Sequence, residues 1–429
     1  MSDVGLACNK VAGCVGAVNA IPDGWSLDKL ENFVTNKILG TTSRGTGLSN
    51  VLLLKMGNLK GGRINYDKVE YVENKEELQS LTLEYGDFLF NTRNTPELVG
   101  KVSNFCEKRL KAVYDNNLLR LKFNDYIDPI YMGYLFNLGS TVQQLKQIVA
   151  GTTSVAAIYW KDLALLKQIV PPLPEQQKIA QILTSVDEVI EKTQAQIDKL
   201  KDLKTAMMQE LLTKGIGHLE FKDSPMGRIP VGWEVVKFSE IFIDYKYGPR
   251  FSSKDYDLRG NVKTIRGTDV SKSGKITYQQ VPTAKIDANV VESHALKEGD
   301  LVMITTADCG ATAIFHKQKI SYIASAYAIK LSPKNDVDSQ FILYFMQTSP
   351  AIKQVESFIR KGTVANLPGS DVMNIKLALP SLDEQRKISN VLLQLDGDIE
   401  LKEEKVKSSI NMKKALMQDL LTGKVRVDV

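Results

Sequence analysis

The sequence predicts a mixed α/β (α+β) protein of two globular domains and two long helices, arranged as a pseudo-twofold internal repeat. Residues 171–213 align without gaps with residues 380–422, and 17 of these 43 positions are identical. Both copies have helical periodicity, whereas short apolar runs bounded by Gly, Asp or Asn indicate strands elsewhere. Two repeats this long exclude a solenoid. They indicate a molecule suited to a two-sided partner or ligand.

The chain order follows from phrases that occur once in each half. Ile-Pro-x-Gly-Trp opens the halves at 21–25 and 229–233, and a Gly-Asp pair recurs at 86–87 and 299–300. A Gly-Thr pair recurs at 151–152 and 362–363, and between these echoes the halves differ. The predicted order is a tail (1–20), a first variable domain (21–170), a spacer helix (171–214), a linker with a second variable domain (215–379), a second spacer helix (380–425) and a short tail (426–429).

Within the variable domains, five apolar runs predict strands and two longer segments predict helices. The strand runs are 51–54, 88–90, 118–121, 301–304 and 327–331. The helical segments are 135–148 and 341–359.

The two spacer segments predict amphipathic helices that end at Gly215 and Gly423. About 39 helical residues would form a rod of roughly 58 Å. Since so long an apolar stripe cannot be buried within a small domain, we expect the helices to pack on each other as an antiparallel coiled coil. That packing would place the variable domains at opposite ends of one spacer.

Composition is ordinary for a globular protein, with 43% hydrophobic and 24% charged residues and a formal net charge of +5. The positive excess lies in the variable domains and not in the spacer helices. No stretch reaches about 18 apolar residues, so we expect no transmembrane helix. Residues 1–20 lack the basic leader and long apolar core of a signal peptide. The four scattered cysteines fit a reducing cytoplasm.

Motifs of catalysis are missing from the sequence. It has no glycine-rich cofactor loop, no Asn/Asp-Pro-Pro-aromatic strip and no Walker motif. Glu73-Asn74-Lys75 superficially resembles the end of a nuclease motif, but a solvated turn is the better interpretation. His218, His294 and His316 lack ligand spacing and are expected to be surface or packing residues. We therefore expect a binding role, with neither a catalytic nor a metal site and no cofactor in this chain.

The doubled Glu-Gln helix resembles the specificity subunits of type I restriction–modification systems. Leu-Pro-Glu-Gln-Gln-Lys-Ile at 173–179 and Leu-Asp-Glu-Gln-Arg-Lys-Ile at 382–388 carry the resemblance, as do the endings at 208–213 and 417–423. The likeness covers residues 21 to about 425. It implies a non-catalytic subunit in which two target-recognition domains each read one half of a bipartite, gapped site in double-stranded DNA. It also implies docking of methylation subunits, expected to be two, which use S-adenosylmethionine, and of restriction subunits, which use ATP and Mg²⁺. The loops at 91–96 and 305–310 follow the family pattern only loosely.

Candidate DNA-binding residues are basic or polar side chains in glycine-rich or polar stretches beside strands. Arginine can bind guanine and asparagine adenine through paired hydrogen bonds, while lysine more often neutralises phosphate. The densest basic patch, at 245–278, interleaves Tyr247, Phe251 and Tyr256. Each candidate taken singly could be a solvated charge or a turn hydroxyl. The candidates are Arg44, Lys60, Arg63, Arg93, Asn94, Lys101, Thr152, Thr153, Arg250, Lys254, Arg259, Arg266, Lys272, Lys275, Lys361 and Thr363.

Two other classes of function stay open at this point. One is a self-contained nuclease or methyltransferase whose motifs have diverged, which activity of the purified chain with DNA, Mg²⁺ and S-adenosylmethionine would reveal. The other is a protein-interaction scaffold without DNA contact, which a salt-dependent DNA affinity would exclude. The target sequence, the gap length and the relative orientation of the domains cannot be read from the sequence.

Overall fold

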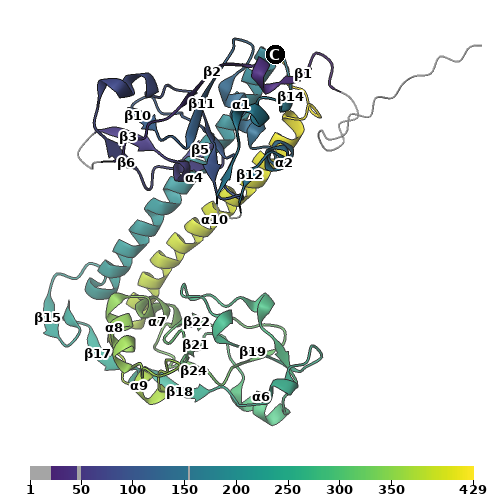
Figure 1. Ribbon diagram of the computed structural model, residues 1–429. Coiled ribbons are helices and arrows are strands. Elements are labelled where there is room, and N and C mark those ends of the chain that lie inside the picture. The colour runs from purple at the N-terminus through teal and green to yellow at the C-terminus, as the bar shows by residue number, and fades with distance from the viewer. Residues whose placement is uncertain (1–20, 46–49, 153–154) are drawn as a thin grey trace, which may run out of the picture. The chain divides into compact units, whose positions relative to one another are not determined.

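The computed structural model describes residues 21–45, 50–152 and 155–429. The described residues form two compact units, one of those up to Gln194 with Glu404–Val429 and the other of Ala195–Glu403 (Figure 1). Helices α4 (Leu173–Lys214) and α10 (Leu382–Leu420) each contribute residues to both units. Among the described residues, no helix is both long and apolar enough to cross a membrane.

The first unit is built on a four-stranded antiparallel sheet with the order β2-β11-β7-β9. Phe88 and Phe90 on its strand β7 are fully buried, which explains the apolar run in the sequence. The strands are β2 (Val34–Leu39), β7 (Phe88–Asn91), β9 (Val102–Asn104) and β11 (Leu118–Phe123).

A smaller three-stranded sheet of the first unit has the order β10-β3-β6, with β10 parallel and β6 antiparallel to β3. Its strands are β3 (Val51–Leu54), β6 (Glu70–Val72) and β10 (Ala112–Tyr114). The remaining strands form short pairs and one three-stranded ladder. They are β1 (Ser26–Lys29) with β14 (Lys167–Val170), β4 (Leu59–Lys60) with β5 (Arg63–Ile64), and β12 (Ala150–Gly151) with β13 (Ala156–Ala157) and β8 (Arg93–Asn94).

The second unit repeats this topology although its sequence differs. Its four-stranded sheet has the order β18-β24-β21-β22, and its three-stranded sheet β20-β19-β23 again pairs one parallel and one antiparallel neighbour with the central strand. The strands are β17 (Glu234–Lys237), β18 (Phe242–Tyr247), β19 (Val262–Ile265), β20 (Thr283–Ala284), β21 (Leu301–Ile304), β22 (Thr312–Ile314), β23 (Ser321–Ala324), β24 (Ala328–Pro333) and β25 (Lys376–Leu379). A hairpin of β15 (Phe221–Ser224) and β16 (Gly227–Pro230) precedes them.

Four of the five runs predicted as strands lie within β3, β7, β11 and β21, and the run 327–331 lies in β24 except for Tyr327, which belongs to the turn before it. The two predicted domain helices are wrong in one respect, because each is broken into two. In the second unit the break lies at Gln347 and Thr348, and Pro350 in the next helix's first turn has no N–H to continue the ladder. The observed helices are α1 (Pro129–Phe136), α2 (Gly139–Gln147), α7 (Ser339–Met346) and α8 (Ser349–Phe358). Short helices complete the units: α3 (Trp160–Leu163), α5 (Phe238–Ile241), α6 (Ala288–His294) and α9 (Gly369–Val372).

The two long helices run antiparallel to each other within each unit. In the second unit Lys204 pairs with Asp396 at 2.6 Å and Lys201 with Glu403 at 2.7 Å, so residue numbers rise along one helix as they fall along the other. The apolar stripes are buried against the domains as well as against each other. Ile179, Leu183, Leu420 and Leu421 belong to the core of the first unit, and Leu212, Ile388 and Leu392 to the core of the second.

Candidate nucleic-acid interface

The glutamate of the first Glu-Gln motif binds the Ile-Pro-x-Gly-Trp segment at the start of the first domain. Glu175 is 2% exposed, and its Oε2 accepts a hydrogen bond from Trp25 Nε1 at 3.2 Å. Arg426 donates to both carboxylate oxygens, Nε to Oε1 at 2.7 Å and Nη2 to Oε2 at 2.8 Å. Because a buried carboxylate is stable only with such partners, the role of this motif glutamate is structural.

The second unit builds the same anchor with a histidine and a backbone N–H in place of the arginine. Glu384 Oε2 accepts from Trp233 Nε1 at 3.1 Å, and Oε1 lies 2.7 Å from His218 Nε2 and accepts from the Ile216 N–H at 3.0 Å. His218 therefore packs against the motif glutamate and the Trp233 ring, as predicted for a packing residue.

The glutamine of each motif holds the start of a domain helix. Gln176 Oε1 accepts from the Asp128 N–H at 2.9 Å, and Gln385 Oε1 accepts from the Asp338 N–H at 2.8 Å. Asp128 and Asp338 in turn cap α1 and α7 with their side chains. The Glu-Gln pair thus joins each spacer helix to the globular part of its unit.

A third contact joins both long helices to the first domain. Tyr134 of α1 donates its hydroxyl to Asp187 Oδ2 of α4 at 2.8 Å, and Lys413 of α10 lies 2.7 Å from Asp187 Oδ1. The Lys413 ammonium also lies over the Tyr134 ring, 5.1 Å from its centroid. Burial and the neighbouring Asp187 raise the pKa of Tyr134, so this hydroxyl stays a donor.

The second unit has the same cluster with the two helices exchanged. Tyr344 of α7 donates to Asp396 Oδ2 of α10 at 2.7 Å, and Lys204 of α4 pairs with Asp396 Oδ1. Lys204 lies 5.2 Å from the centroid of the Tyr344 ring. Burial and the hydrogen bond to Asp396 raise the pKa of Tyr344.

The repeated Gly-Asp pair forms the turn before an inner strand of each large sheet, β7 in the first unit and β21 in the second. Gly86 has φ +94°, and the Asp87 carboxylate accepts from the Glu84 N–H at 3.0 Å and from Arg120 Nη1 at 3.3 Å. In the second unit Asp300 makes the equivalent turn and accepts from the Lys297 N–H at 2.8 Å. The repeated Gly-Asp pair therefore has a structural role in each unit and contributes no base-reading group.

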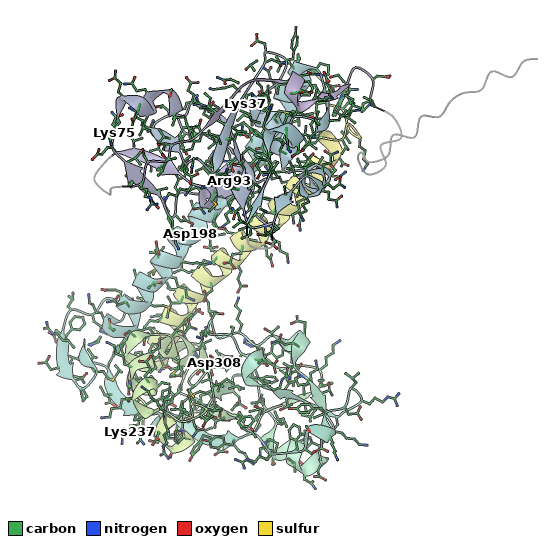
Figure 2. All side chains as sticks on the ribbon, in the orientation of Figure 1. Lys37, Lys75, Arg93, Asp198, Lys237 and Asp308 are labelled. Carbon is green, nitrogen blue, oxygen red and sulfur yellow. The ribbon has the colours of Figure 1, made fainter. Side chains whose placement is uncertain are left out.

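Four first-unit candidates lie near the ladder β12-β13-β8. Pairing of β13 with both neighbours brings Arg93 and Asn94 beside the Gly-Thr turn of Thr152. Arg93, which Figure 2 labels, and Thr152 are exposed, whereas Asn94 and Lys101 are half-buried. Thr153 lies outside the described residues.

The remaining first-unit candidates lie on two other segments. Arg44 is exposed in the loop after β2. Lys60 and Arg63 face each other across the β4–β5 hairpin, and Lys60 is exposed. Arg63 instead points to α4, where its Nη1 lies 2.6 Å from Glu191 Oε1 and its Nε 3.5 Å from Asp187 Oδ2. Burial would lower the pKa of Arg63, but these two carboxylates raise it above the usual value.

Three second-unit candidates follow the edge of the sheet β20-β19-β23. Arg250, Lys254 and Arg259 are exposed in a segment that bridges to β20 through Tyr256 and Ala284. The aromatic residues interleaved with these candidates already have internal contacts.

The internal contacts of these aromatic residues are specific. Phe251 packs on Tyr256 with ring centroids 5.3 Å apart, and the Tyr247 hydroxyl accepts from the Gly369 N–H at 2.6 Å. Their sequence pattern therefore reflects packing at least as much as base stacking.

Three further candidates surround a tight turn of the second unit. Arg266 is bound to the fully buried Asp269 through Nε and Nη2, each at 3.2 Å, and this hydrogen bonding raises the pKa of Arg266. Lys272 is exposed, and Lys275 forms an ion pair with Glu400 of α10.

Lys361 and Thr363 are exposed on the second Gly-Thr loop. Backbone bridges of Asn366 with Arg360 and with Thr306 place this loop beside the loop after β21, which repeats the first-unit arrangement. That neighbouring loop contains Asp308, labelled in Figure 2, and Ala307, the one non-glycine with positive φ in the described chain, at 64°. The sequence pattern did not indicate Arg360, whose side chain is 71% exposed next to Lys361. The repeated Gly-Thr pair at 362–363, which follows Arg360, was the sequence signal that could have identified this residue.

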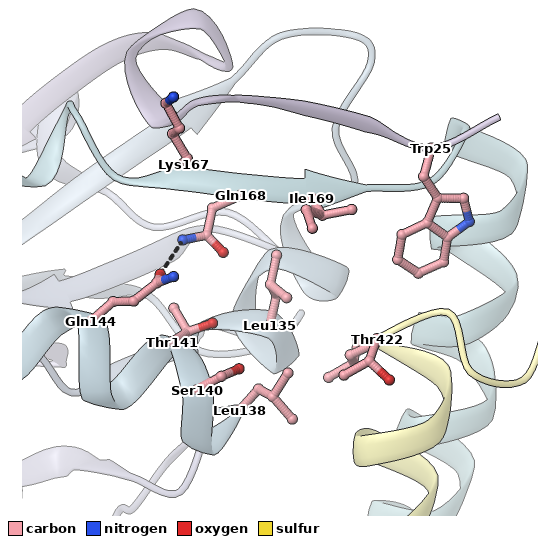
Figure 3. Close-up of a pocket in the computed structure, with 11 residues that line it drawn as sticks. Trp25, Leu135, Leu138, Ser140, Thr141, Gln144, Lys167, Gln168, Ile169 and Thr422 are labelled. Carbon is pink, nitrogen blue, oxygen red and sulfur yellow. Dashed lines mark hydrogen bonds between the residues drawn. The ribbon is translucent and has the colours of Figure 1, made fainter. Parts of the chain in front are cut away.

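The cavity in Figure 3 lies in the first unit, between β14 and the end of α10. It has a volume of about 30 Å³ and contains a Gln168–Gln144 hydrogen bond of 3.2 Å. Such a cavity has room for a water molecule or two, and not for a nucleotide or a cofactor. Among the described residues, no three His, Cys, Asp or Glu side chains are grouped to hold a metal ion.

The two units have the same topology and are joined to the repeated long helices, but their cationic loops differ in sequence. This combination defines an internally duplicated recognition scaffold. The family described as "Type I restriction modification DNA specificity domain" matches residues 53–202 and 230–412. The chain belongs to this family, the specificity subunits of type I restriction–modification systems, which are non-catalytic members of multisubunit assemblies.

Individual relatives match most of the chain. The MjaX type I restriction enzyme specificity subunit of Methanocaldococcus jannaschii, whose own assignment is provisional, is 30% identical over 96% of both chains. The MjaVIII specificity subunit of the same organism is 30% identical over 74% of this chain and 75% of its own. The crystal structure of the S subunit from M. genitalium matches with a TM-score of 0.60 and 15% identity, covering 97% of this chain and 99% of that one. The last likeness shows a shared fold.

Proposed function

We propose that each unit reads one half of a bipartite, gapped site in double-stranded DNA, and that α4 and α10 set the separation of the halves and dock methylation subunits. The observation that carries this proposal is the contrast between the structural elements that the two units share and the exposed loops in which they differ. Strand orders, helix caps and the Tyr-Asp-Lys clusters are the same in both units. The exposed cationic residues differ between the units in number, type and position.

The chemistry of the exposed loops supports DNA contact. Lysines such as Lys60, Lys272 and Lys361 suit phosphate neutralisation, which gives affinity without sequence preference. Arg93 has a guanidinium that can pair with the O6 and N7 of guanine, and Asn94 has an amide that can pair with adenine. A unit that presents side chains of both kinds could position itself on the DNA backbone and read base edges.

The long helices support the spacing and docking roles. Two reading modules on one face of a duplex need centres about one helical turn apart, roughly 34–36 Å, and a helical spacer can fix such a distance. The spacer segments carry no positive excess, which suits protein contact better than DNA contact. Because the helix repeat is doubled, two methylation subunits could bind in equivalent ways.

The proposal places chemistry in partner subunits of a cytoplasmic complex. Methylation subunits would use S-adenosylmethionine to modify adenine, and restriction subunits would use ATP and Mg²⁺ to cleave unmodified DNA. This chain would supply recognition.

The test is to map methylated adenines in a host that carries this gene with its methylation subunit and in a matched deletion strain. We expect a two-part motif with a fixed gap that disappears on deletion. Introducing Arg93→Ala should relax one half of the motif, and Lys361→Ala should weaken methylation of the whole motif without relaxing either half. Lys222→Ala, at an exposed lysine of β15 outside the long helices and the candidate loops, is the control and should leave the motif unchanged.

An unchanged methylation pattern on deletion, with the methylation subunit expressed and bound to this chain, would overturn the proposal in favour of a scaffold without DNA contact. Methylation or cleavage by the purified chain alone would instead favour a self-contained enzyme.

A further inference from the structure

A short sequence outside the helix repeat also occurs in both units. Residues 60–66 read Lys-Gly-Gly-Arg-Ile-Asn-Tyr, and residues 272–278 read Lys-Ser-Gly-Lys-Ile-Thr-Tyr. The first copy forms the β4–β5 hairpin, and the second forms a turn closed by pairing of Val270 with Ile276. Each follows a 3₁₀ helix, Met56–Asn58 or Gly267–Asp269. The two units therefore hold equivalent hairpins, called here the anchor hairpins.

The shared glycine of the anchor hairpins has a structural reason. Gly62 has φ +89° and Gly274 has φ +85°, a region that L side chains rarely adopt. A Cβ on Gly274 would lie 2.7 Å from Leu343 Cδ1, and one on Gly62 would lie 3.1 Å from Asn137 Nδ2. Each turn is thus tight and packed against its domain, so the residue after the glycine leaves it in a defined direction.

In the first unit the residue after this glycine reaches α4. Arg63 Nη1 lies 2.6 Å from Glu191 Oε1, and Arg63 Nε lies 3.5 Å from Asp187 Oδ2. The Arg63 carbonyl accepts from Ser103 Oγ at 2.8 Å, which holds the hairpin on β9. Arg63 therefore connects the sheet to the helix.

In the second unit Lys275 occupies the equivalent position and pairs with Glu400 of α10. Glu191 and Glu400 are aligned, identical positions of the helix repeat. The Ser273 carbonyl in this turn also accepts from Gln347 Nε2 at 3.4 Å. Both units thus link the anchor hairpin to a long helix by an ion pair with the repeated glutamate. The cation is Arg63 in the first unit and Lys275 in the second.

The first lysine of each anchor hairpin faces solvent, unlike the cation that follows the glycine. Lys60 and Lys272 are exposed, and neither has an ion-pair partner in the described part of the chain. Each anchor hairpin therefore presents one cation to solvent and directs the other to the helix.

We propose that Arg63 and Lys275 are positioning residues that tie each anchor hairpin to the helix glutamate and so fix where Lys60 and Lys272 meet the DNA backbone. This inference rests on the proposed function and replaces direct DNA contact for Arg63 and Lys275. Partly exposed ion pairs add little to folding stability. Their effect is on the orientation of the hairpin relative to the spacer helix, and therefore on the gap length that the protein accepts.

The experiment uses the complex of this chain with its methylation subunit and measures methylation of DNA with the preferred gap and with gaps one base pair longer and shorter. Arg63→Gln and Glu191→Gln should each reduce the preference for the correct gap by about two- to fivefold, the range of an exposed ion pair. Lys275→Gln and Glu400→Gln should do the same in the second unit. The charge exchanges Arg63→Glu with Glu191→Arg, and Lys275→Glu with Glu400→Lys, should restore the preference.

Direct DNA contact by Arg63 predicts the opposite pattern. Glu191→Gln would then leave the gap preference unchanged, and the charge exchange would not rescue Arg63→Glu; either result overturns the inference. Lys60→Ala should weaken binding and reduce the slope of log K against log salt by about one, and in that background Arg63→Gln should no longer alter binding through this contact. The Gln variants should keep the melting temperature of the parent, which separates positioning from folding. If the parent complex methylates no bipartite motif at all, that result contradicts the proposed function itself and not only the role of these ion pairs.

Discussion

Asp187 of α4 and Lys413 of α10 form an ion pair of 2.7 Å, and their repeat equivalents Asp396 and Lys204 form one of 2.6 Å with the helices exchanged. Each repeat thus gives its aspartate to one unit and its lysine to the other. This reciprocity is what a twofold-related interface between identical partners shows, here within one chain. In each unit a tyrosine of the domain completes the cluster, so the globular part is attached to both helices at once.

We expect Asp396→Asn to destabilise the second unit. The amide would keep a contact with Tyr344 but would leave Lys204, whose side chain is 18% exposed, without its carboxylate. Losing a charge-assisted bond in a half-buried setting costs about 1–3 kcal/mol. Urea unfolding followed by circular dichroism measures the effect.

Glu188→Gln is the matched control for the aspartate. Its ion pair with Lys192 lies on one face of α4, and both side chains are more than half exposed, at 54% and 75%. Such a pair contributes within about 0.5 kcal/mol. Equal unfolding midpoints for Asp396→Asn and Glu188→Gln would show that the cluster does not hold the domain to the helices.

Two glycines of the second unit should respond in opposite directions to alanine. Gly215, just beyond the end of α4, has φ +67°, and a Cβ there would lie 2.4 Å from Glu384 Oε1 and 2.8 Å from Trp233. Gly215→Ala should therefore cost about 1–3 kcal/mol. Gly397 lies inside α10, where an added Cβ would meet open space, so Gly397→Ala should stabilise by about 0.5–1 kcal/mol. Thermal melts of the two variants should shift in opposite senses, and a shared direction would contradict the assigned roles.

Arg266→Ala should affect folding as well as DNA recognition. The arginine satisfies the fully buried Asp269 through two hydrogen bonds of 3.2 Å, although Asp269 keeps the Arg266 backbone N–H at 2.9 Å. With the guanidinium partly exposed, we expect a loss of about 0.5–1.5 kcal/mol in stability together with weaker reading of one half-site. Arg259→Ala, at an exposed arginine of the same segment, should leave stability within about 0.5 kcal/mol. A fully stable Arg266→Ala that loses half-site reading would assign Arg266 to DNA contact alone.

The sequence predicted the helical frame well because its signals are local and doubled. A 3.6-residue period and terminal glycines define α4 and α10, and an ungapped repeat shows that they are equivalent. The identities of the repeat include Asp187, Glu191 and Lys204, which could have identified the clusters in advance. Their partners could not be predicted, since Tyr134 and Arg63 approach the helix only through the fold of a separate domain.

The candidate interface was predicted less completely for a related reason. A basic residue beside a glycine can face solvent or turn inward, and the sequence pattern does not distinguish the two. Lys60 and Lys272 face solvent, whereas Arg63 and Lys275 face helix glutamates. The choice depends on which carboxylate the tertiary structure brings within reach of the side chain.

Replacing single exposed cations should separate affinity from specificity. Lys361 is exposed on the Gly-Thr loop of the second unit, and Arg93 is exposed on the ladder of the first. Lys361→Ala should weaken binding to all sequences and lower the salt slope by about one. Arg93→Ala should cost about 1–3 kcal/mol at one base pair and relax specificity there, if the guanidinium reads guanine. Competition binding at several salt concentrations, with DNA altered in one half-site at a time, distinguishes these outcomes.

The matched control for both is Lys192→Ala, which removes an equal charge from an exposed face of α4. Because that face belongs to the spacer, neither the affinity nor the salt slope should change. If Lys192→Ala lowers the salt slope as much as Lys361→Ala does, the DNA follows the helices and not the loops. If Arg93→Ala relaxes both half-sites equally, the two units do not read separate halves. The combination of a one-sided loss at Arg93 with a uniform loss at Lys361 is what two independent reading units on a shared helical frame require.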